Sequence, residues 1–434
     1  MTSNPAILVY AAPLLVIWAL YLGSRWRSEK RNRAIQEAAA RAGHIEPVSL
    51  HPLIDANICI GCESCAKACP AGRILGMIQG KAQLIDPSGC IGHGACKLAC
   101  PVDAISLVFG TEKRGVDIPV VSPSFETNAP GLFIAGELGG MGLIRNAIEQ
   151  GRQAVASVRK LEGIGQAMPL DLVIVGAGPA GFSASLAAME HKLRAVTVEQ
   201  DTLGGTVAHY PRGKLVMTSP AILPLFGKVK LTETNKEELL EFWHKVEKQT
   251  GVQINYGERV ETISGTDMGF EVKTTGGTYR TRAVLLAIGR RGTPRKLEVP
   301  GENLPKVVYR LIDPAQYRGK NVLVVGGGDS ALEAASSIAE EPETTVTIAY
   351  RSAAFSRAKP KNQQRIKEVA DAGRLRVLMK SQVKRIDAEE VEIDCEGKLL
   401  SLRNDAVIVC AGGILPTAFL KSIGIAVETK YGTA

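Results

Sequence analysis

The hydrophobic positions of this chain gather in short apolar runs, and two of these runs are followed by a glycine-rich turn and a helical pattern. The runs are DLVIV at residues 171–175 and NVLVV at residues 321–325. A further apolar run follows each unit, RAVTVE ending at Glu199 and TVTIAYR ending at Arg351. Apolar runs that alternate with helical patterns predict parallel strands with crossover helices, so we expect an α/β protein.

The first part of the chain lacks this alternation. Ala6 to Leu22 is uncharged and about long enough, at ~1.5 Å per residue, to cross most of a ~30 Å hydrocarbon layer. Basic residues come after it from Arg25 onward, unlike a cleaved signal peptide, and this charge pattern places the rest of the chain in the cytoplasm. We predict a transmembrane helix over residues 5–23 and a basic stalk helix over residues 24–48, hence a single-pass protein of the bacterial inner membrane. The alternative is a buried core helix.

Cysteine spacing marks a second kind of module. The chain contains Cys59-x2-Cys62-x2-Cys65-x3-Cys69-Pro70 and, further on, Cys90-x2-His93-x2-Cys96-x3-Cys100-Pro101. The two motifs together resemble a bacterial two-cluster ferredoxin, which implies a small α+β domain over residues 49–110. In this spacing three thiolates hold one cluster and the fourth reaches the other. The predicted ligands are Cys59, Cys62, Cys65 and Cys100 for cluster one, and Cys69, Cys90, His93 and Cys96 for cluster two.

His93 stands where the ferredoxin pattern has a cysteine. Three interpretations are open: His93 is an iron ligand, the cluster has three irons, or His93 is a polar loop residue. We favour ligation, because imidazole is a competent iron ligand and a neutral ligand in place of thiolate should raise the reduction potential. A zinc site is the main alternative to iron for both motifs.

The first glycine-rich turn carries a dinucleotide fingerprint. GAGPAG, Gly176 to Gly181, follows a predicted strand and opens a helix, and Glu199 ends the next strand, where an acid can bind the adenosine ribose hydroxyls. The loop LGGTVAHYPRG then begins at Leu203, and LLAIG at residues 285–289 reads as a later strand of the same unit.

A segment that precedes this fingerprint resembles the end of a known family. TNAPGLFIAGELGG, beginning at Thr127, is similar to the closing segment of thioredoxin-reductase-like flavoproteins, which completes their FAD site. In that family it comes last, so the resemblance implies a circular permutation. Glu137 replaces the family's aspartate, and residues 145–147 match an Arg-Gln-Ala at a helix start. The resemblance and the fingerprint together predict FAD contacts at Gly136, Glu137, Arg145, Asn146, Ala147, Gly176, Gly178, Pro179, Ala180, Gly181, Glu199 and Gly205.

A second fingerprint, GGGDSA, follows NVLVV and predicts a nicotinamide nucleotide site. The strand after it ends at Arg351 without an acid, and Arg357 comes next among the basic residues. Arginine suits a 2′-phosphate, so we favour NADPH, with NADH possible; a solvated loop is the bland alternative. The predicted contacts are Gly326, Gly328, Asp329, Ser330, Ala331, Arg351 and Arg357.

These modules give an expected order of domains. The fold is predicted to be two Rossmann-like domains, for FAD and NAD(P)H, preceded by the ferredoxin domain and the membrane helix. Beyond residue 110 we expect a permuted closing segment at 111–160, a linker at 161–169, the FAD domain at 170–298, the NAD(P)H domain at 299–415 and a return to the FAD domain at 416–434.

Composition adds two limits. The formal charge of +8 is modest and partly local to residues 25–41, so nucleic acid is not an expected partner. The family's redox Cys-x-x-Cys is missing, because VVYRLIDPAQYRGK at residues 307–320 contains no cysteine.

The leading hypothesis is therefore a membrane-anchored NAD(P)H oxidoreductase in which FAD converts two-electron transfer into single steps and two iron–sulfur clusters carry the electrons. The partner is open among a membrane complex, quinone, cytochrome or ferredoxin, and a homodimer is expected. The alternatives are a disulfide or small-molecule reductase fed by the clusters, and a membrane-tethered redox sensor. We name no catalytic acid or base.

Overall fold

The computed structural model divides into two compact units, residues 1–115 with 430–434, and residues 116–429. It describes residues 5–41, 47, 50–70, 72–90, 92–111, 115–140, 142–166, 168–217, 220–229, 233–290, 292–356 and 358–432, and among these the side chains from Pro13 onward except at positions 88, 215, 217 and 233.

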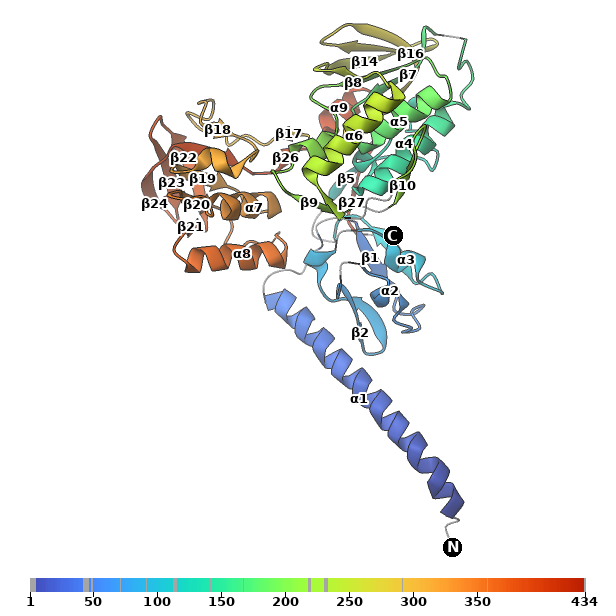
Figure 1. Cartoon of the computed structure of the whole chain (residues 1–434), viewed down its shortest axis with the longest axis vertical. Helices are drawn as coiled ribbons and strands as arrows, with labels where there is room; N and C mark the ends of the chain where they lie inside the picture. Colours follow the sequence, from blue (N-terminus) through green and yellow to red (C-terminus); the bar gives the residue numbers. More distant parts are fainter. Residues whose placement is uncertain are drawn as a thin grey trace. The chain divides into compact units, whose positions relative to one another are not determined.

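The first unit combines a long helix with a small α+β domain (Figure 1). Strands β1 and β4 pair antiparallel, and β2 and β3 form a hairpin whose turn places Gln79 and Gly80 at positive φ. Two single-turn helices, α2 and α3, each begin directly before a cysteine of the motifs. The elements are α1 (Pro5–Arg41), β1 (His51–Ile54), α2 (Ser64–Lys67), β2 (Leu75–Ile78), β3 (Lys81–Leu84), η1 (Pro87–Gly89), α3 (Ala95–Leu98) and β4 (Ile105–Val108).

Helix α1 joins the two predicted N-terminal segments into one element. Its second half binds the β2–β3 hairpin, because Asn32 is buried and its Nδ2 donates to the main-chain oxygen of Met77 at 3.1 Å. One turn further, Gln36 Nε2 donates to Gln83 Oε1 at 3.2 Å. The basic segment therefore has one face fixed to the hairpin.

The predicted membrane helix is wrong. Over the described part of the chain, no helix is long and apolar enough to cross a membrane. Helix α1 carries no charged residue before Arg25, and from Arg25 onward it is rich in charged residues and packs on the β2–β3 hairpin. The localisation inferred from that helix, a single-pass inner-membrane protein, is corrected with it.

The larger unit is built on two sheets, a mixed one and a parallel one. The first has the order β13-β8-β7-β16-β15-β14, with β6 also paired to β16. The pairs along β13, β8, β7, β16 and β6 are parallel, whereas β16, β15 and β14 form an antiparallel meander. Its strands are β6 (Leu132–Ile134), β7 (Leu170–Val175), β8 (Ala195–Glu199), β13 (Asn255–Tyr256), β14 (Val260–Thr266), β15 (Gly269–Thr274) and β16 (Thr278–Leu286).

Helices α4, α5 and α6 accompany this sheet (Figure 1). Alanines of α4 and α5 pack together with apolar residues of the strands in one core cluster, and α6 contributes Trp243 to a second. The remaining elements of this part are β5 (Val116–Pro119), η2 (Glu137–Gly139), α4 (Ile144–Val158), α5 (Pro179–Glu190), η3 (Gly205–His209), β9 (Leu215–Met217), β10 (Ala221–Leu223), β11 (Gly227–Val229), β12 (Glu233–Asn235) and α6 (Lys236–Thr250).

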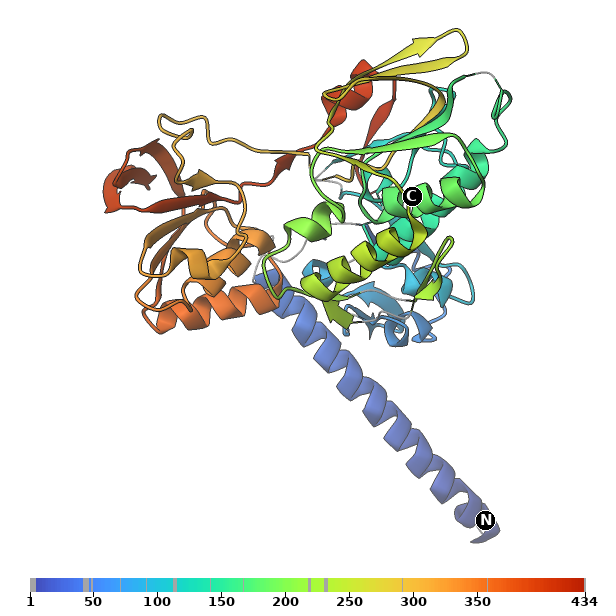
Figure 2. The same ribbon diagram turned by 45° about the horizontal axis from the view of Figure 1, so that its top comes forward.

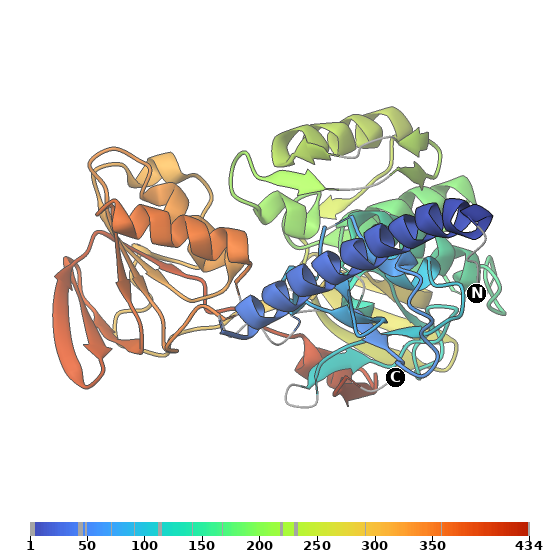
Figure 3. The same ribbon diagram turned by 90° about the horizontal axis from the view of Figure 1, so that it is seen from below.

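The second sheet has the parallel order β18-β25-β19-β20-β21, beside the antiparallel meander β22-β23-β24 (Figure 3). Short strands β17 and β26 pair where the chain passes between the two sheets (Figure 2). The elements are β17 (Thr293–Pro294), β18 (Val307–Val308), η4 (Pro314–Tyr317), β19 (Asn321–Val325), α7 (Asp329–Ile338), β20 (Thr345–Ala349), α8 (Pro360–Asp371), β21 (Leu375–Leu378), β22 (Ser381–Ile386), β23 (Glu390–Cys395), β24 (Lys398–Arg403), β25 (Ala406–Val409) and β26 (Gly413–Ile414).

The chain then returns to the first sheet. Leu420 of α9 (Thr417–Ser422) and Ile425 lie in the core cluster of that sheet, and β27 (Val427–Lys430) pairs with β5. Asn128 fixes the return: its Nδ2 donates to Gly424 O at 2.9 Å and its Oδ1 accepts from the Ala426 N–H at 2.7 Å. Segments from both ends of the unit thus pair in a separate two-stranded sheet, and the C-terminal one also packs on the core of the first sheet.

Candidate functional site

The first fingerprint forms a tight turn between β7 and α5. Gly176 has φ +102°, which favours glycine, and a Cβ there would lie 2.7 Å from the Ala287 oxygen. A Cβ on Gly181 would overlap the Gly176 carbonyl oxygen, so α5 packs directly on the turn. Gly178 is the N-cap of α5, Pro179 is its first residue, and Ala180 is buried in the same first turn.

Glu199 lies at the carboxyl end of β8, where the acid was expected. Its carboxylate is buried and already binds the fingerprint, because Oε2 accepts from the Ala177 N–H at 2.6 Å and Oε1 from the Asp201 N–H at 2.9 Å. Each oxygen keeps a second lone pair. Gly205 approaches from the next loop, where an added Cβ would lie 2.9 Å from Gly178 Cα, so backbone faces backbone.

The segment around Gly136 reaches the same turn from the other side. Strand β6 pairs in parallel with the end of β16, and a Cβ on Gly136, at φ +83°, would lie 2.9 Å from Ala180 Cβ. A Cβ on Gly151 of α4 would overlap the Ala180 carbonyl oxygen, which holds α4 against α5. The fingerprint turn and the segment around Gly136, which resembles a closing segment, are therefore in contact in the folded chain.

Glu137 follows Gly136 and is mostly buried. Burial raises the pKa of this carboxyl, while the charge of Arg290 and a hydrogen bond from the Arg290 main chain oppose that rise. Arg145, Asn146 and Ala147 lie in the first turn of α4; Arg145 is exposed and Ala147 is buried.

The helices that follow the motifs begin in the same way. The N-caps of α4, α5 and α7 are Leu143, Gly178 and Gly328, and none of the three supplies a side-chain cap to its described helix. By contrast, α6 starts with a full capping box between Asn235 and Glu238. Uncapped N–H groups and the positive end of the helix dipole suit phosphates and electron-rich rings, so these residues fit FAD and a nicotinamide nucleotide.

The second fingerprint repeats the turn between β19 and α7. Gly326 has φ +144°, and a Cβ there would overlap the Cys410 carbonyl oxygen. Gly328 caps α7, and Asp329, Ser330 and Ala331 form its first turn, with Ala331 fully buried. This local geometry matches that of the first fingerprint.

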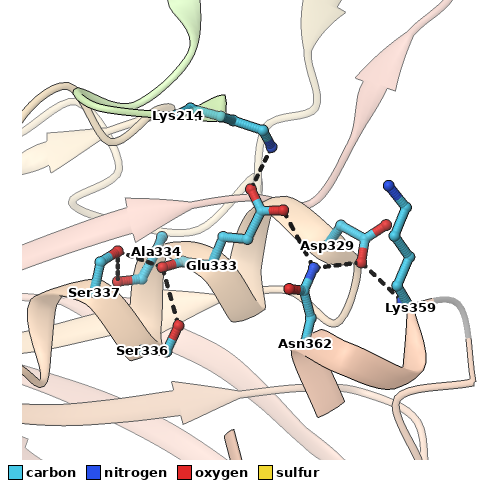
Figure 4. A network of polar contacts seen from close by, with 8 residues as sticks. All are labelled: Lys214, Asp329, Glu333, Ala334, Ser336, Ser337, Lys359 and Asn362. Atoms are coloured by element: carbon cyan, nitrogen blue, oxygen red, sulfur yellow. Dashed lines mark hydrogen bonds and ion pairs between the residues drawn. The ribbon is translucent and has the colours of Figure 1, made fainter. Parts of the chain in front are cut away.

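A polar network ties this turn to the loop that follows β20 (Figure 4). Asp329 Oδ1 accepts from the Lys359 N–H at 2.8 Å and from Asn362 Nδ2 at 2.7 Å. Arg351, at the start of that loop, is exposed and makes no hydrogen bond or ion pair within the described residues. Arg357 lies outside the described residues.

Two residues near this site were not predicted. Tyr350 directly follows β20, and its ring lies so close to Gly327 that an added Cβ would overlap it; the ring stacks on Phe355 with centroids 5.6 Å apart. Lys214 Nζ, from the loop after η3, pairs with Glu333 Oε2 of α7 at 2.5 Å (Figure 4). Tyr350 could have been predicted from the sequence, because it lies at the end of the strand where a ribose-binding acid was expected. Lys214 could not, because no local sequence pattern marks it.

The first set of cysteines surrounds a cavity. A narrow pocket of about 10 Å³ is lined by Cys59, Cys62, Cys65 and Cys100, the four ligands predicted for cluster one. Burial raises the pKa of the Cys65 thiol to about 11, so a bound cation is needed to hold it as a thiolate at neutral pH. The set of four cysteine donors around one pocket fits an iron–sulfur cluster.

The second set is also gathered. His93 Nε2 lies 3.8 Å from Cys69 Sγ. Burial raises the pKa of Cys90 and Cys96, and the nearby Cys69 thiolate adds to this rise for both. No three His, Cys, Asp or Glu side chains among the described residues meet at a single metal-ion position. That separation is compatible with ligands spread around a cluster, which is larger than one ion.

Comparison with known proteins identifies both parts. Residues 173–433 match the family described as pyridine nucleotide-disulphide oxidoreductase, and residues 51–101 match the 4Fe-4S dicluster domain.

Several of the similar proteins are named as reductases. Bacilliredoxin reductase Bdr of Bacillus subtilis is 27% identical over 266 residues, 60% of this chain and 82% of its own. A ferredoxin–NADP reductase of Ignicoccus hospitalis is 30% identical over 275 residues, 60% and 83% respectively. Among solved structures, the bacillithiol disulfide reductase Bdr from Staphylococcus aureus matches with a TM-score of 0.53 at 24% identity, over 60% of this chain and 82% of that one, a similarity of fold.

Proposed function

The chain belongs to the pyridine nucleotide-disulphide oxidoreductase family, and we propose that it moves electrons between NAD(P)H and a one-electron partner through FAD and two iron–sulfur clusters. It is an oxidoreductase with a thioredoxin-reductase-like flavoprotein fold and a 4Fe-4S dicluster domain. A purely sensory role is therefore disfavoured.

The observation that carries the proposal is the combination of two glycine turns before uncapped helices with a cysteine-lined cavity in the same chain. When bound, FAD couples the two-electron chemistry of nicotinamide to single-electron steps, which iron–sulfur clusters accept or supply. Residues 307–320 contain no cysteine. A dithiol exit is thus unsupported, and the clusters are the remaining path.

The residues of the flavin side have binding and orienting roles. The N–H groups at the starts of α5 and α4 would hold the pyrophosphate and the pyrimidine side of FAD, respectively. Glu199 keeps the fingerprint turn in shape through the Ala177 N–H and offers its remaining lone pairs to the ribose. Glu137 would hold the ribityl chain from the opposite side.

On the nucleotide side, Gly326 to Ala331 would receive the pyrophosphate of NAD(P)H. We assign Arg351 and Arg357 to a 2′-phosphate, so NADPH is the preferred donor. Asp329 would not repel the phosphates strongly, because its carboxylate is engaged by Lys359 and Asn362. Both iron–sulfur sites use the ligands predicted from spacing, with His93 as the fourth ligand of cluster two.

We also propose that the flavoprotein part is circularly permuted. Strand β6, which precedes the first fingerprint in the chain, lies beside β16, and β5 pairs with the late strand β27. A chain that ran from β27 directly into β5 would have the family's usual order. The partner is expected to be a ferredoxin-type carrier, because several relatives are named ferredoxin–NADP reductases.

Anaerobic titration of the purified protein with NADPH and NADH tests the proposal. Optical and electron spin resonance spectra should show the flavin and the clusters becoming reduced as nucleotide is added. This reduction should need lower concentrations of NADPH than of NADH. Protein that contains FAD and iron, yet shows no cluster reduction with either nucleotide, would contradict it.

A second candidate is a disulfide or small-molecule reductase that receives electrons from the clusters. The similarity to Bacilliredoxin reductase favours it. Steady-state turnover separates the two, because this candidate, supplied with a reductant of the clusters, should reduce disulfides faster than one-electron acceptors.

A further inference from the structure

Arg290 occupies a place at the flavin side that no motif assigns. It comes directly after Gly289, in the loop that leads from the end of β16 toward β17. Its side chain is half-buried, and Nη2 donates to the main-chain oxygen of Asp117 at 3.0 Å. Asp117 belongs to β5, the first strand of this unit, and its own carboxylate accepts from Thr429 Oγ1 at 2.8 Å.

The same residue contacts Glu137 through its backbone. The Arg290 main chain hydrogen-bonds to the Glu137 carboxylate. A Cβ on Gly289 would lie 4.0 Å from Glu137 Oε2 and 3.9 Å from Thr206 Oγ1, so the loops after β6, β8 and β16 converge here. Ligands of open parallel sheets bind outside the carboxyl ends of such strands.

The charge of Arg290 is incompletely matched. A guanidinium carries five N–H donors and keeps its proton throughout the working pH range. Within the described residues the only acceptor of a hydrogen bond from its side chain is the neutral Asp117 carbonyl, and the Arg290 guanidinium forms no ion pair there. Burial lowers the pKa of Arg290, while the charges of Glu137 and Asp117 oppose that effect from a distance. A partly buried cation with spare donors favours an anion nearby.

We infer that Arg290 is a positioning residue of the flavin site, which orients Glu137 through its main chain and provides a fixed positive charge toward the flavin. The inference rests on the proposed function, since it assumes that FAD binds at these strand ends. Reduction adds negative charge to a flavin, so a fixed cation beside it favours the reduced form and raises its reduction potential. The hydrogen bond from Arg290 Nη2 to the Asp117 carbonyl of β5 keeps the guanidinium from rotating into solvent.

The test compares Arg290→Gln and Arg290→Lys with a matched control. The control, Arg282→Gln, removes an arginine that lies within β16, before the loop that carries Arg290. The Nε of Arg282 donates to the main-chain oxygen of Glu162 at 2.8 Å. Bound FAD per chain is measured by absorbance, and the flavin midpoint potential by anaerobic titration with dithionite and redox dyes.

We expect Arg290→Gln to retain FAD and to shift the flavin midpoint to more negative values, so that the reduced-to-oxidised ratio at a fixed potential falls about tenfold. Arg290→Lys should recover most of the shift, and Arg282→Gln should match the unmodified protein. An unchanged midpoint in FAD-bound Arg290→Gln overturns the inference. Loss of FAD from Arg290→Gln, with an unchanged midpoint in Arg290→Lys, also overturns it, because it makes Arg290 a residue of FAD retention only.

This outcome is independent of the proposed function as a whole. Dithionite reduces the flavin without NAD(P)H and without a partner, so the midpoint can be measured even if no nucleotide reduces the clusters. The proposed function fails instead in the unmodified protein, through absent FAD or absent cluster reduction by NAD(P)H.

Discussion

Single residues in this chain act mainly by shaping the backbone. Gly151 and Gly181 are each set so close to a neighbouring carbonyl that a methyl group would overlap it, and both contacts hold elements of the flavin side together. Glu199 binds main-chain N–H groups of the fingerprint. The side chains with chemical character are few, which agrees with cofactors that carry the reaction themselves.

Asp171 shows how a buried carboxylate supports this frame. It lies near the start of β7 and accepts hydrogen bonds from Arg194 Nη2 at 2.8 Å and from the Gly165 N–H at 2.6 Å. Burial by itself raises the pKa of Asp171, but the bonds from Arg194 and Gly165 outweigh it and leave the pKa below its usual value. Asp171→Asn should therefore cost about 2 kcal/mol of stability at pH 7.

The pH dependence of that loss has a definite sign. A carboxyl with a lowered folded-state pKa stabilises the protein above its unfolded value of about 3.9, and this contribution is lost as the pH falls through the folded value. The gap in melting temperature between Asp171→Asn and the unmodified protein should narrow below about pH 4. Thermal unfolding followed by circular dichroism checks this, with the exposed Glu261→Gln as control. A gap that stays constant at every pH would assign the loss to shape rather than charge.

His93 gives the second prediction at this scale. If it ligates iron, His93→Ala should convert cluster two to a three-iron form, while His93→Cys should keep four irons and lower the cluster potential. Iron analysis and low-temperature spin resonance spectra distinguish these forms. His244→Ala, on the surface of α6, serves as control. A normal four-iron signal in His93→Ala would show that His93 is not a ligand.

At the scale of elements, helix starts and the loops beside them organise the site. Helices α4, α5 and α7 leave their first N–H groups without side-chain caps, and α8 fixes the loop after β20 through Asn362. The Lys214–Glu333 pair links the loop after η3 to α7. Partly exposed ion pairs contribute little to the free energy of unfolding, so the role we assign to this pair is to position the loop after η3 against α7.

Asn362 offers a test of how the nucleotide loop is held. Its Nδ2 donates to Asp329 Oδ1 at 2.7 Å and to Glu333 Oε1 at 3.2 Å. Asn362→Ala should loosen the loop that begins at Arg351 and raise the KM for NADPH about fivefold, the effect of roughly 1 kcal/mol, with kcat nearly unchanged. The control is Gln364→Ala on the same helix, whose side chain contacts only Glu368 among the described hydrogen-bond partners. An equal rise in the KM for NADH would show that the loop does not recognise the 2′-phosphate.

Across the whole molecule, the sequence predicted the features that depend on local pattern. The apolar runs at 171–175 and 321–325 are strands β7 and β19, and each is followed by its glycine turn and helix. The docking of α1 on the β2–β3 hairpin was missed because it depends on Asn32 meeting a main-chain oxygen 45 residues away. Tyr350 and Lys214 were missed for the same reason, since their partners are set by packing. The predicted membrane helix was wrong, since no helix among the described residues is long and apolar enough to span a bilayer.

The last prediction concerns transfer between the two units. They are joined at two points of the chain, between Gly115 and Val116 and between Thr429 and Lys430. Covalent joining makes the second unit a partner at high effective concentration. Electron transfer from the flavin to the clusters should therefore be intramolecular. In anaerobic stopped-flow mixing with excess NADPH, the rate constant of cluster reduction should stay the same over a tenfold range of protein concentration. A rate constant that rises in proportion to protein concentration would mean that electrons pass between molecules, and the fused clusters would then need a different role.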